Sequence, residues 1–137
     1  MYSLLDISGS GMTGNKEWME TIGNNLANIN TTRTENGGPY KRQSVAFESR
    51  KRFDTILNKE MGNGIEVGKI VQDDNTKLVY DPDHPDANEE GYVQYPEINM
   101  TSEMTDLLMA ERGYEANSSV LTASKKVIEK EHEIGRV

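Results

Sequence analysis

The segment of this sequence that most resembles a chemical site is glycine-rich: Gly9–Gly14 fits G-x-G-x-x-G. In dinucleotide-binding folds such glycines bring backbone N–H groups onto a pyrophosphate, directly after a buried strand. Here only the short stretch 4–7 precedes the glycines, Asp6 interrupts it, and an apolar heptad runs through the whole segment. We therefore interpret the segment as part of a helix and expect no nucleotide cofactor.

An acidic segment, Asp81–Glu90, contains several carboxylates and His84, which are possible ligands for a hard cation or a transition metal. The spacing does not fit a calcium-binding EF-hand loop, because Pro85 stands at the fifth position and no glycine follows at the sixth. Aspartates beside prolines are typical of turns. We therefore expect a solvated, turn-forming loop and no metal site.

The residues give no support for catalysis. The two histidines are His84 in the acidic segment and His132 near the end of an expected helix, and Ser118 and Ser119 lack the G-x-S-x-G elbow. The chain contains no cysteine, which excludes disulfides, thiol catalysis and thiolate zinc sites. We predict that the protein is not an enzyme and has no catalytic, cofactor or metal residues.

The composition predicts one domain with an incomplete core. The chain has 137 residues, a net charge of −8 and only 34% hydrophobic residues, so we expect something outside the chain to complete the core. The acidic charge argues against nucleic acid as a partner. The longest apolar run, 107–110, is too short to cross a bilayer, and no basic residue precedes Lys16. We expect neither membrane insertion nor a cleavable secretory signal.

Near the N-terminus, apolar residues recur with the period of a helix that packs along a partner. The row repeats every seven residues, and Ile22 and Ile29 add the alternating three-residue step. We predict a helix over 5–29, about 37 Å long. Several glycines lie inside it and weaken it by roughly 1 kcal/mol each, so it needs a neighbour. The row consists of Leu5, Met12, Met19 and Leu26.

Near the C-terminus, a longer heptad row predicts a helix over 101–134, about 50 Å long, with Thr101 as N-cap and Gly135 after its end. A period sustained over four heptads is typical of a coiled-coil-like partner. Two core helices of an ordinary small α+β domain are the alternative. The main row is Met100, Leu107, Tyr114, Leu121 and Ile128; a second row is Val120, Val127 and Ile134; a small-residue row is Ala110, Asn117 and Ser124.

The middle of the chain predicts short strands. Alternating residues around 45–47 form one candidate, and 65–71 is expected to turn at 73–75 into 77–80 as a hairpin. The fold class is therefore mainly α with a small β part (α+β), in which coiled-coil-like terminal helices flank a hairpin and loop region. We expect paired helices from 1–30 plus 101–137, and a loop-rich β region over 31–100.

These segments together resemble the bacterial flagellar basal-body rod family of axial proteins, its proximal rod members in particular. The similarity covers nearly the whole chain, and the Asp-Pro-Asp-His-Pro-Asp stretch is the most distinctive part. One mild departure is Gly113, where the family leads us to expect another residue. The matching segments are 5–12 (LDISGSGM), 24–31 (NNLANINT), 31–34, 37–42 (GGPYKR), 79–93, 95–99, 103–104 and 112–117.

The resemblance implies a structural subunit that polymerises into the proximal rod, the drive shaft from motor to hook. It implies self-assembly, other rod proteins and the flagellar type III export apparatus as partners. It also implies a place outside the cytoplasmic membrane, periplasmic in double-membrane cells. Other axial subunits, or a small monomeric binding module, are the alternatives. We expect the acidic segment to form a fixed turn and subunit contact. The expected assembly residues are Leu5, Met12, Met19, Ile22, Leu26, Leu107, Tyr114, Leu121 and Ile128.

Overall fold

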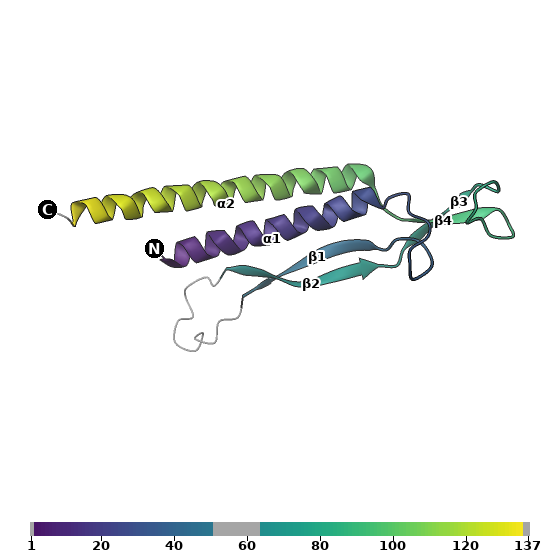
Figure 1. Cartoon of the computed structure of the whole chain (residues 1–137), viewed down its shortest axis with the longest axis horizontal. Coiled ribbons are helices and arrows are strands. Elements are labelled where there is room, and N and C mark those ends of the chain that lie inside the picture. The colour runs from purple at the N-terminus through teal and green to yellow at the C-terminus, as the bar shows by residue number, and fades with distance from the viewer. Residues whose placement is uncertain (1, 51–63, 136–137) are drawn as a thin grey trace.

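The computed structural model of the chain describes residues 2–50 and 64–135 and shows two long terminal helices with two small β-ribbons (Figure 1). This architecture confirms the predicted α+β class. The division into a helical part and a β part, each with its own boundaries, stays a prediction. The elements are α1 (Tyr2–Ala27), β1 (Arg42–Ser49), β2 (Ile65–Asp73), β3 (Thr76–Tyr80), β4 (Tyr92–Pro96) and α2 (Met100–Ile134).

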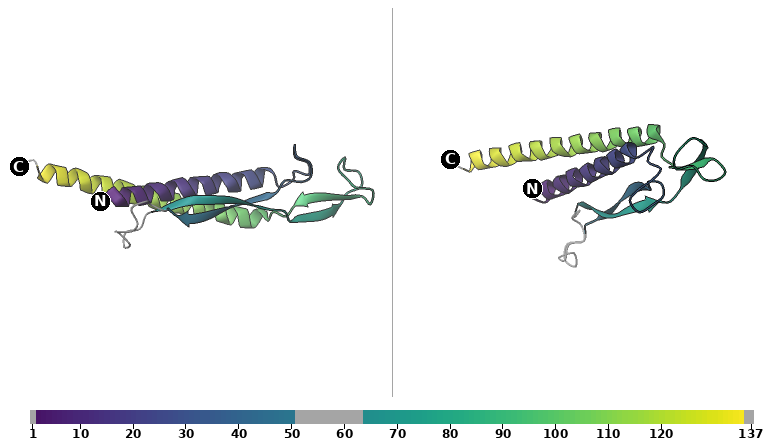
Figure 2. Two further views of the ribbon diagram at one scale, coloured as in Figure 1. Left: turned by 90° about the horizontal axis from the view of Figure 1, so that it is seen from below. Right: turned by 45° about the vertical axis from the view of Figure 1, so that its right-hand side comes forward.

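The elements form layers, with α1 in the middle. On one side α1 packs along α2, and on the other side it contacts β1 and β2. The ribbon of β3 and β4 extends beyond the end of the helix pair (Figures 1 and 2). The helices run antiparallel, and the C-terminal end of α2 reaches past the N-terminal end of α1 (Figure 1). The glycine-rich α1 therefore has a neighbour on both sides, as its weak helix propensity requires.

The helix ends differ from prediction by a few residues. Helix α1 spans Tyr2–Ala27 rather than 5–29. The predicted N-cap of α2, Thr101, is wrong: the cap is Asn99, whose side-chain oxygen accepts from the Ser102 backbone N–H at 3.1 Å. Both residue types make good caps, so the sequence alone did not separate them. The C-terminal end is confirmed, because Gly135 is the C-cap and its N–H donates to the Glu131 carbonyl.

The strand pairing is not the predicted one. Strand β2 pairs antiparallel with β1, and β3 pairs antiparallel with β4, so the expected hairpin of 65–71 with 77–80 is wrong. The turn residues 73–75 do make a local turn, in which the Asn75 N–H donates to Asp73 Oδ1 at 3.0 Å. The Asn75 carbonyl then accepts from Glu97, beside the end of β4. The chain therefore passes from one ribbon into the next instead of folding back.

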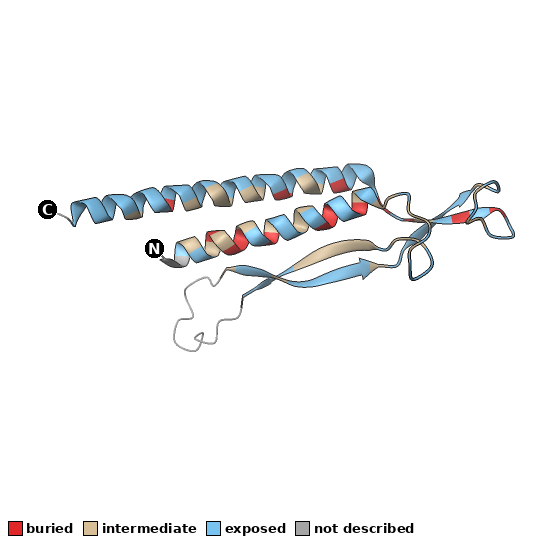
Figure 3. Ribbon diagram, in the orientation of Figure 1, coloured by how far each residue is buried: buried red, intermediate tan, exposed pale blue. Residues whose placement is uncertain are grey.

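The core is small and largely polar. Among the described residues, the buried apolar side chains are Ile22, Val93, Pro96, Ile98 and Ala110. Buried positions cluster along the side of α1 and recur along one side of α2 (Figure 3). Large apolar side chains remain outside, as the composition predicts. The buried polar or charged residues are Ser8, Ser10, Thr21, Asn25, Glu103 and Ser124.

Within the described ranges, neither helix combines the length and the apolar character that crossing a membrane would need.

Candidate assembly interface

The predicted assembly residues all lie on the two helices, and all but one remain partly accessible. Ile22 is buried, at 2% exposure. The others have intermediate burial within a single chain, so part of each side chain is still available for contact with another molecule. The structure therefore places them at the edges of the helix pair. The half-buried residues are Leu5, Met12, Met19, Leu26, Leu107, Tyr114, Leu121 and Ile128.

The most deeply buried heptad row of α2 consists of small and polar residues. Glu103, Ala110 and Ser124 are buried, and Asn117, on the same heptad row, is half-buried. Ser124 donates to the Val120 carbonyl of its own helix at 2.8 Å. Small side chains allow two helix backbones to approach closely. The larger apolar rows consequently flank the centre of the pair.

A second apolar row of α2 lies beside the buried row and is largely exposed to solvent. Val120 and Val127, from the second predicted row, are 41% and 49% exposed, and Ile134 is 76% exposed. Met109 continues the same row toward the N-terminal end of the helix at 58% exposure, and the exposed Ala116 and Ala123 lie between. We name this row, Met109, Ala116, Val120, Ala123, Val127 and Ile134, the outer α2 face. Its spacing of three, four or seven residues is that of a helix seam.

A buried polar junction joins α1, β1 and α2. Glu103 and Asn25 are each 1% exposed. Glu103 Oε1 accepts from Arg42 Nε and lies 2.7 Å from Arg42 Nη2 as well, and Oε2 accepts from Asn25 Nδ2 at 3.0 Å. Asn25 also exchanges two hydrogen bonds with the Gln43 backbone, and Tyr40 Oη donates to Asn25 Oδ1 at 3.1 Å. We call these residues the polar junction.

The polar junction was missed from the sequence. One signal for Glu103 was present: it lies seven residues before Ala110, on the small-residue row that was recognised. Its partners come from distant segments, which no local pattern connects. Among the described residues, every buried side-chain nitrogen or oxygen has a hydrogen-bond partner. Burial of the Tyr40 hydroxyl raises its pKa above 10.0, and the nearby Glu103 carboxylate raises the pKa further.

The first ribbon is held on α1 by contacts at the glycine-rich segment. Trp18 and Phe47 pack edge to face with ring centroids 5.9 Å apart. A methyl group at Gly14 would lie 3.0 Å from the Phe47 ring, so a larger residue there would require the ring to shift. Ser10 Oγ accepts from the Ile65 N–H at 3.1 Å and donates to the Ile7 carbonyl. The G-x-G-x-x-G segment thus lies inside a continuous helix, without the strand and turn of a pyrophosphate site.

The acidic segment forms a closed turn. The Asp81 N–H donates to the Gly91 carbonyl, and His84 Nδ1 accepts from the Asp86 N–H at 3.1 Å. Asp86 in turn accepts from Thr32 Oγ1 at 2.8 Å and lies 3.6 Å from an Arg33 nitrogen. These contacts are consistent with the expected fixed turn. Across residues 2–50 and 64–135, we find no group of three or more acidic, His or Cys side chains placed to hold a metal.

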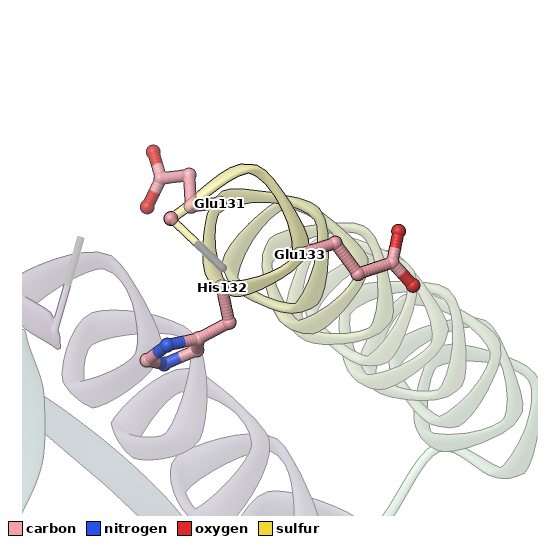
Figure 4. A pocket seen from close by; sticks show the side chains of 4 residues that line it. Glu131, His132 and Glu133 are labelled. Atoms are coloured by element: carbon pink, nitrogen blue, oxygen red, sulfur yellow. The ribbon is translucent and has the colours of Figure 1, made fainter. Parts of the chain in front are cut away.

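A shallow pocket near the C-terminal end of α2 is lined by Glu131, His132, Glu133 and Gly135. Figure 4 shows that the three labelled side chains point in different directions around the helix. They share no point at which a ligand could contact all of them. The pocket therefore adds no binding chemistry, and the helices with the outer α2 face remain the candidate functional surface.

Comparison with known proteins finds a match to a flagellar basal-body rod family at each end of the chain. Residues 5–33 match the family described as Flagella basal body rod protein, and residues 89–130 match Flagellar basal body rod FlgEFG protein C-terminal. The flagellar basal-body rod protein FlgC of Bacillus subtilis is 43% identical over 144 residues, covering 96% of each chain.

Two further relatives carry the same description. FlgC of Borreliella burgdorferi is 36% identical, covering 93% of this chain and 92% of the relative. FlgC of Aquifex aeolicus is 35% identical, covering 97% of this chain and 96% of the relative. The similarity thus extends over both helices and the ribbons between them.

Proposed function

The chain belongs to the FlgC family of flagellar basal-body rod proteins, and we propose that its terminal helices are the parts through which it polymerises. Membership makes it a structural subunit of the basal-body rod that assembles with other rod proteins, and not an enzyme. The proposal concerns how the assembly is made. The terminal helices form the inner, polymerising layer, and the β-ribbons face outward.

The observation that carries this proposal is the exposed outer α2 face. Val120, Val127 and Ile134 are at least 41% exposed, although they are apolar and regularly spaced. A monomer gains no burial free energy from such a row, whereas a second helix placed along it would remove about 25 cal/mol of apolar hydration cost per Å² covered. The occupant that fits is a terminal helix of another copy, since both helices of the chain carry heptad rows.

The half-buried residues at the edges of the helix pair would extend the same interface. We propose that these residues contact both the partner helix and neighbouring subunits. They are Leu5, Met12, Met19 and Leu26 on α1, and Leu107, Tyr114, Leu121 and Ile128 on α2. Contacts between unlike surfaces of identical subunits build helical tubes rather than closed dimers. This geometry suits a drive shaft.

Delivery and location form the finer part of the proposal. A proximal position in the rod, outside the cytoplasmic membrane and periplasmic in double-membrane cells, follows from the family resemblance. Passage through the flagellar type III export apparatus is supported by the sparse core and the absence of cysteine. A chain with little buried apolar surface unfolds easily and gains order when it assembles. The acidic turn is proposed as a subunit contact.

The test uses an aspartate on the outer α2 face. Val120→Asp and Val127→Asp should each leave the monomer's helix signal in circular dichroism within about 10% of wild type, because neither side chain is buried. Both should remove sedimentable polymer and motility in a complemented strain. Ser119→Asp adds the same charge at an exposed position off the face and should assemble normally.

Leu26→Asp and Leu121→Asp test the edge residues, and both should abolish assembly and motility. Normal swimming of all four aspartate variants would overturn the proposal. A helix signal that is independent of protein concentration, in a chain that never sediments, would instead favour a monomeric binding module.

A further inference from the structure

The apolar rows leave the alignment of α1 against α2 undetermined. Each row repeats every seven residues on its own helix, so sliding one helix by seven residues, about 10 Å, would bring equivalent side chains together again. A single observed alignment therefore requires something that does not repeat. Polar or shape-specific contacts are the usual means of fixing register in paired helices.

Two reciprocal contacts between asparagine and glycine lie in the middle of the helix pair. A methyl group at Gly11 would lie 2.8 Å from Asn117 Nδ2 and 3.0 Å from its Cγ. A methyl group at Gly113 would lie 2.9 Å from Asn15 Oδ1 and 3.1 Å from its Cγ. Each asparagine side chain thus occupies the space that the missing Cβ leaves on the facing helix.

Both asparagines are held in place by their own helix. Asn15 Nδ2 donates to the Gly11 carbonyl at 2.9 Å, and Asn117 Nδ2 donates to the Gly113 carbonyl at 2.8 Å. An asparagine that swung away from an added methyl group would therefore lose a hydrogen bond in a half-buried position. The motif is the same on both helices, glycine followed four residues later by asparagine, and the antiparallel orientation pairs each glycine with the other helix's asparagine.

We propose that these two Gly-x-x-x-Asn motifs form a clasp that fixes the register of α1 against α2. The polar junction agrees with the same register. In antiparallel helices, ten residues forward from Asn15 and ten residues back from Gly113 lead to facing positions. These are Asn25 and Glu103, and their side chains are hydrogen-bonded to each other. The clasp also gives a reason for glycine at position 113, where the family resemblance leads us to expect another residue. The inference rests on contacts within one chain and does not depend on the proposed assembly.

The decisive experiment asks whether replacing each helix glycine by alanine stabilises or destabilises the chain. Ala favours helix over Gly, so Gly9→Ala and Gly23→Ala, where a methyl group meets nothing within 4 Å, should each lower the unfolding equilibrium constant about fivefold. Gly11→Ala and Gly113→Ala should raise it, despite the same gain in propensity. Urea unfolding followed by circular dichroism measures all four, at one protein concentration that gives wild type its full helix signal.

Double variants then test which residues pair. Asn15→Ala should relieve Gly113→Ala, and Asn117→Ala should relieve Gly11→Ala, so each matched pair is more stable than the sum of its single effects predicts. The crossed combinations, Gly113→Ala with Asn117→Ala and Gly11→Ala with Asn15→Ala, should be closer to additive. Stabilisation by all four alanines, or equal coupling in matched and crossed pairs, would overturn the proposal.

Spin labels measure the register directly and do not depend on cooperative unfolding. The chain has no cysteine, so labels can be placed through Glu17→Cys and Lys125→Cys, both exposed. The observed register offsets these positions by about 21 Å along the helix axis, and a seven-residue slide would change that by about 10 Å. We expect one narrow distance in the wild-type background and a shifted or broadened one with Gly11→Ala and Gly113→Ala together. An unchanged narrow distance would contradict the clasp.

Discussion

Arg42 and Glu103 are joined across 61 residues of sequence, with Arg42 Nε 2.7 Å from Glu103 Oε1. The carboxylate side chain is 1% exposed, whereas the guanidinium side chain is 29% exposed and still reaches solvent. This ion pair connects the first strand to the first turn of α2, and through Asn25 it includes α1. Charge and hydrogen bonds therefore help to hold these three elements together.

Glu103→Gln should destabilise the chain by about 2–3 kcal/mol, because it leaves Arg42 without its counter-charge and weakens the bond from Asn25. Equilibrium urea unfolding measures the effect. Glu133→Gln is a matched control, since Glu133 pairs with Lys130 on the exposed end of α2 and should change stability by less than about 0.5 kcal/mol. Equal effects of the two variants would show that the polar junction contributes no more than a surface pair.

Tyr40 should make the fold sensitive to alkali. Its pKa in the folded chain is raised above 10.0, first by burial and then by the Glu103 carboxylate. Well below pH 10 the Tyr40 hydroxyl is protonated in both the folded and the unfolded chain. As the pH rises through 10, the unfolded chain loses this proton first. The free energy of unfolding therefore falls with rising pH until the folded pKa is passed. Tyr40→Phe should flatten the decline above about pH 10, and cost about 1 kcal/mol at pH 7 through the lost bond to Asn25.

The control for this pH series is Tyr80→Phe, at a tyrosine that is 65% exposed. It removes a phenol hydroxyl outside the polar junction, so it serves as the comparison for the loss of one tyrosine hydroxyl. A Tyr40→Phe variant whose slope of unfolding free energy against pH equals the wild-type slope would contradict the assignment.

The single tryptophan reports whether the first ribbon is docked on α1. Phe47→Ala removes the edge-to-face contact with Trp18 and should destabilise docking by about 1–2 kcal/mol. We expect Trp18 emission to shift to longer wavelength as water reaches the indole. Leu78→Ala, 61% exposed on the other ribbon, is the control and should leave the emission unchanged. An unchanged spectrum in Phe47→Ala would mean that this contact does not hold the ribbon.

The sequence was sufficient to predict both helices, because their heptad rows are long. Gly135 ends α2 as expected, and the small-residue row of Ala110, Asn117 and Ser124 runs along the buried side of the pair. The assembly residues were correctly placed on the helices, but their partial burial shows only that they are available. Their role in assembly stays a prediction.

The strand pairing and the polar junction could not be predicted for a shared physical reason. An aspartate-asparagine turn at 73–75 has the same local chemistry whether the strands fold back or continue into separate ribbons. The difference lies in which strands pair, β2 with β1 and β3 with β4. Asn25, Arg42 and Glu103 are ordinary helix and strand residues in sequence. Their meeting depends on how three elements pack, which no spacing along the chain encodes.

The helices of the pair are unequal, 26 residues in α1 and 35 in α2, and the surplus lies at the C-terminal end of α2 (Figure 1). The two tips of the pair are therefore chemically unlike: one carries a lone helix end, and the other carries the chain crossings into the ribbons. Subunits stacked along an axis by joining one kind of tip to the other would all point the same way. A shaft made from them would have a built-in polarity, with a growing end distinguishable from its base.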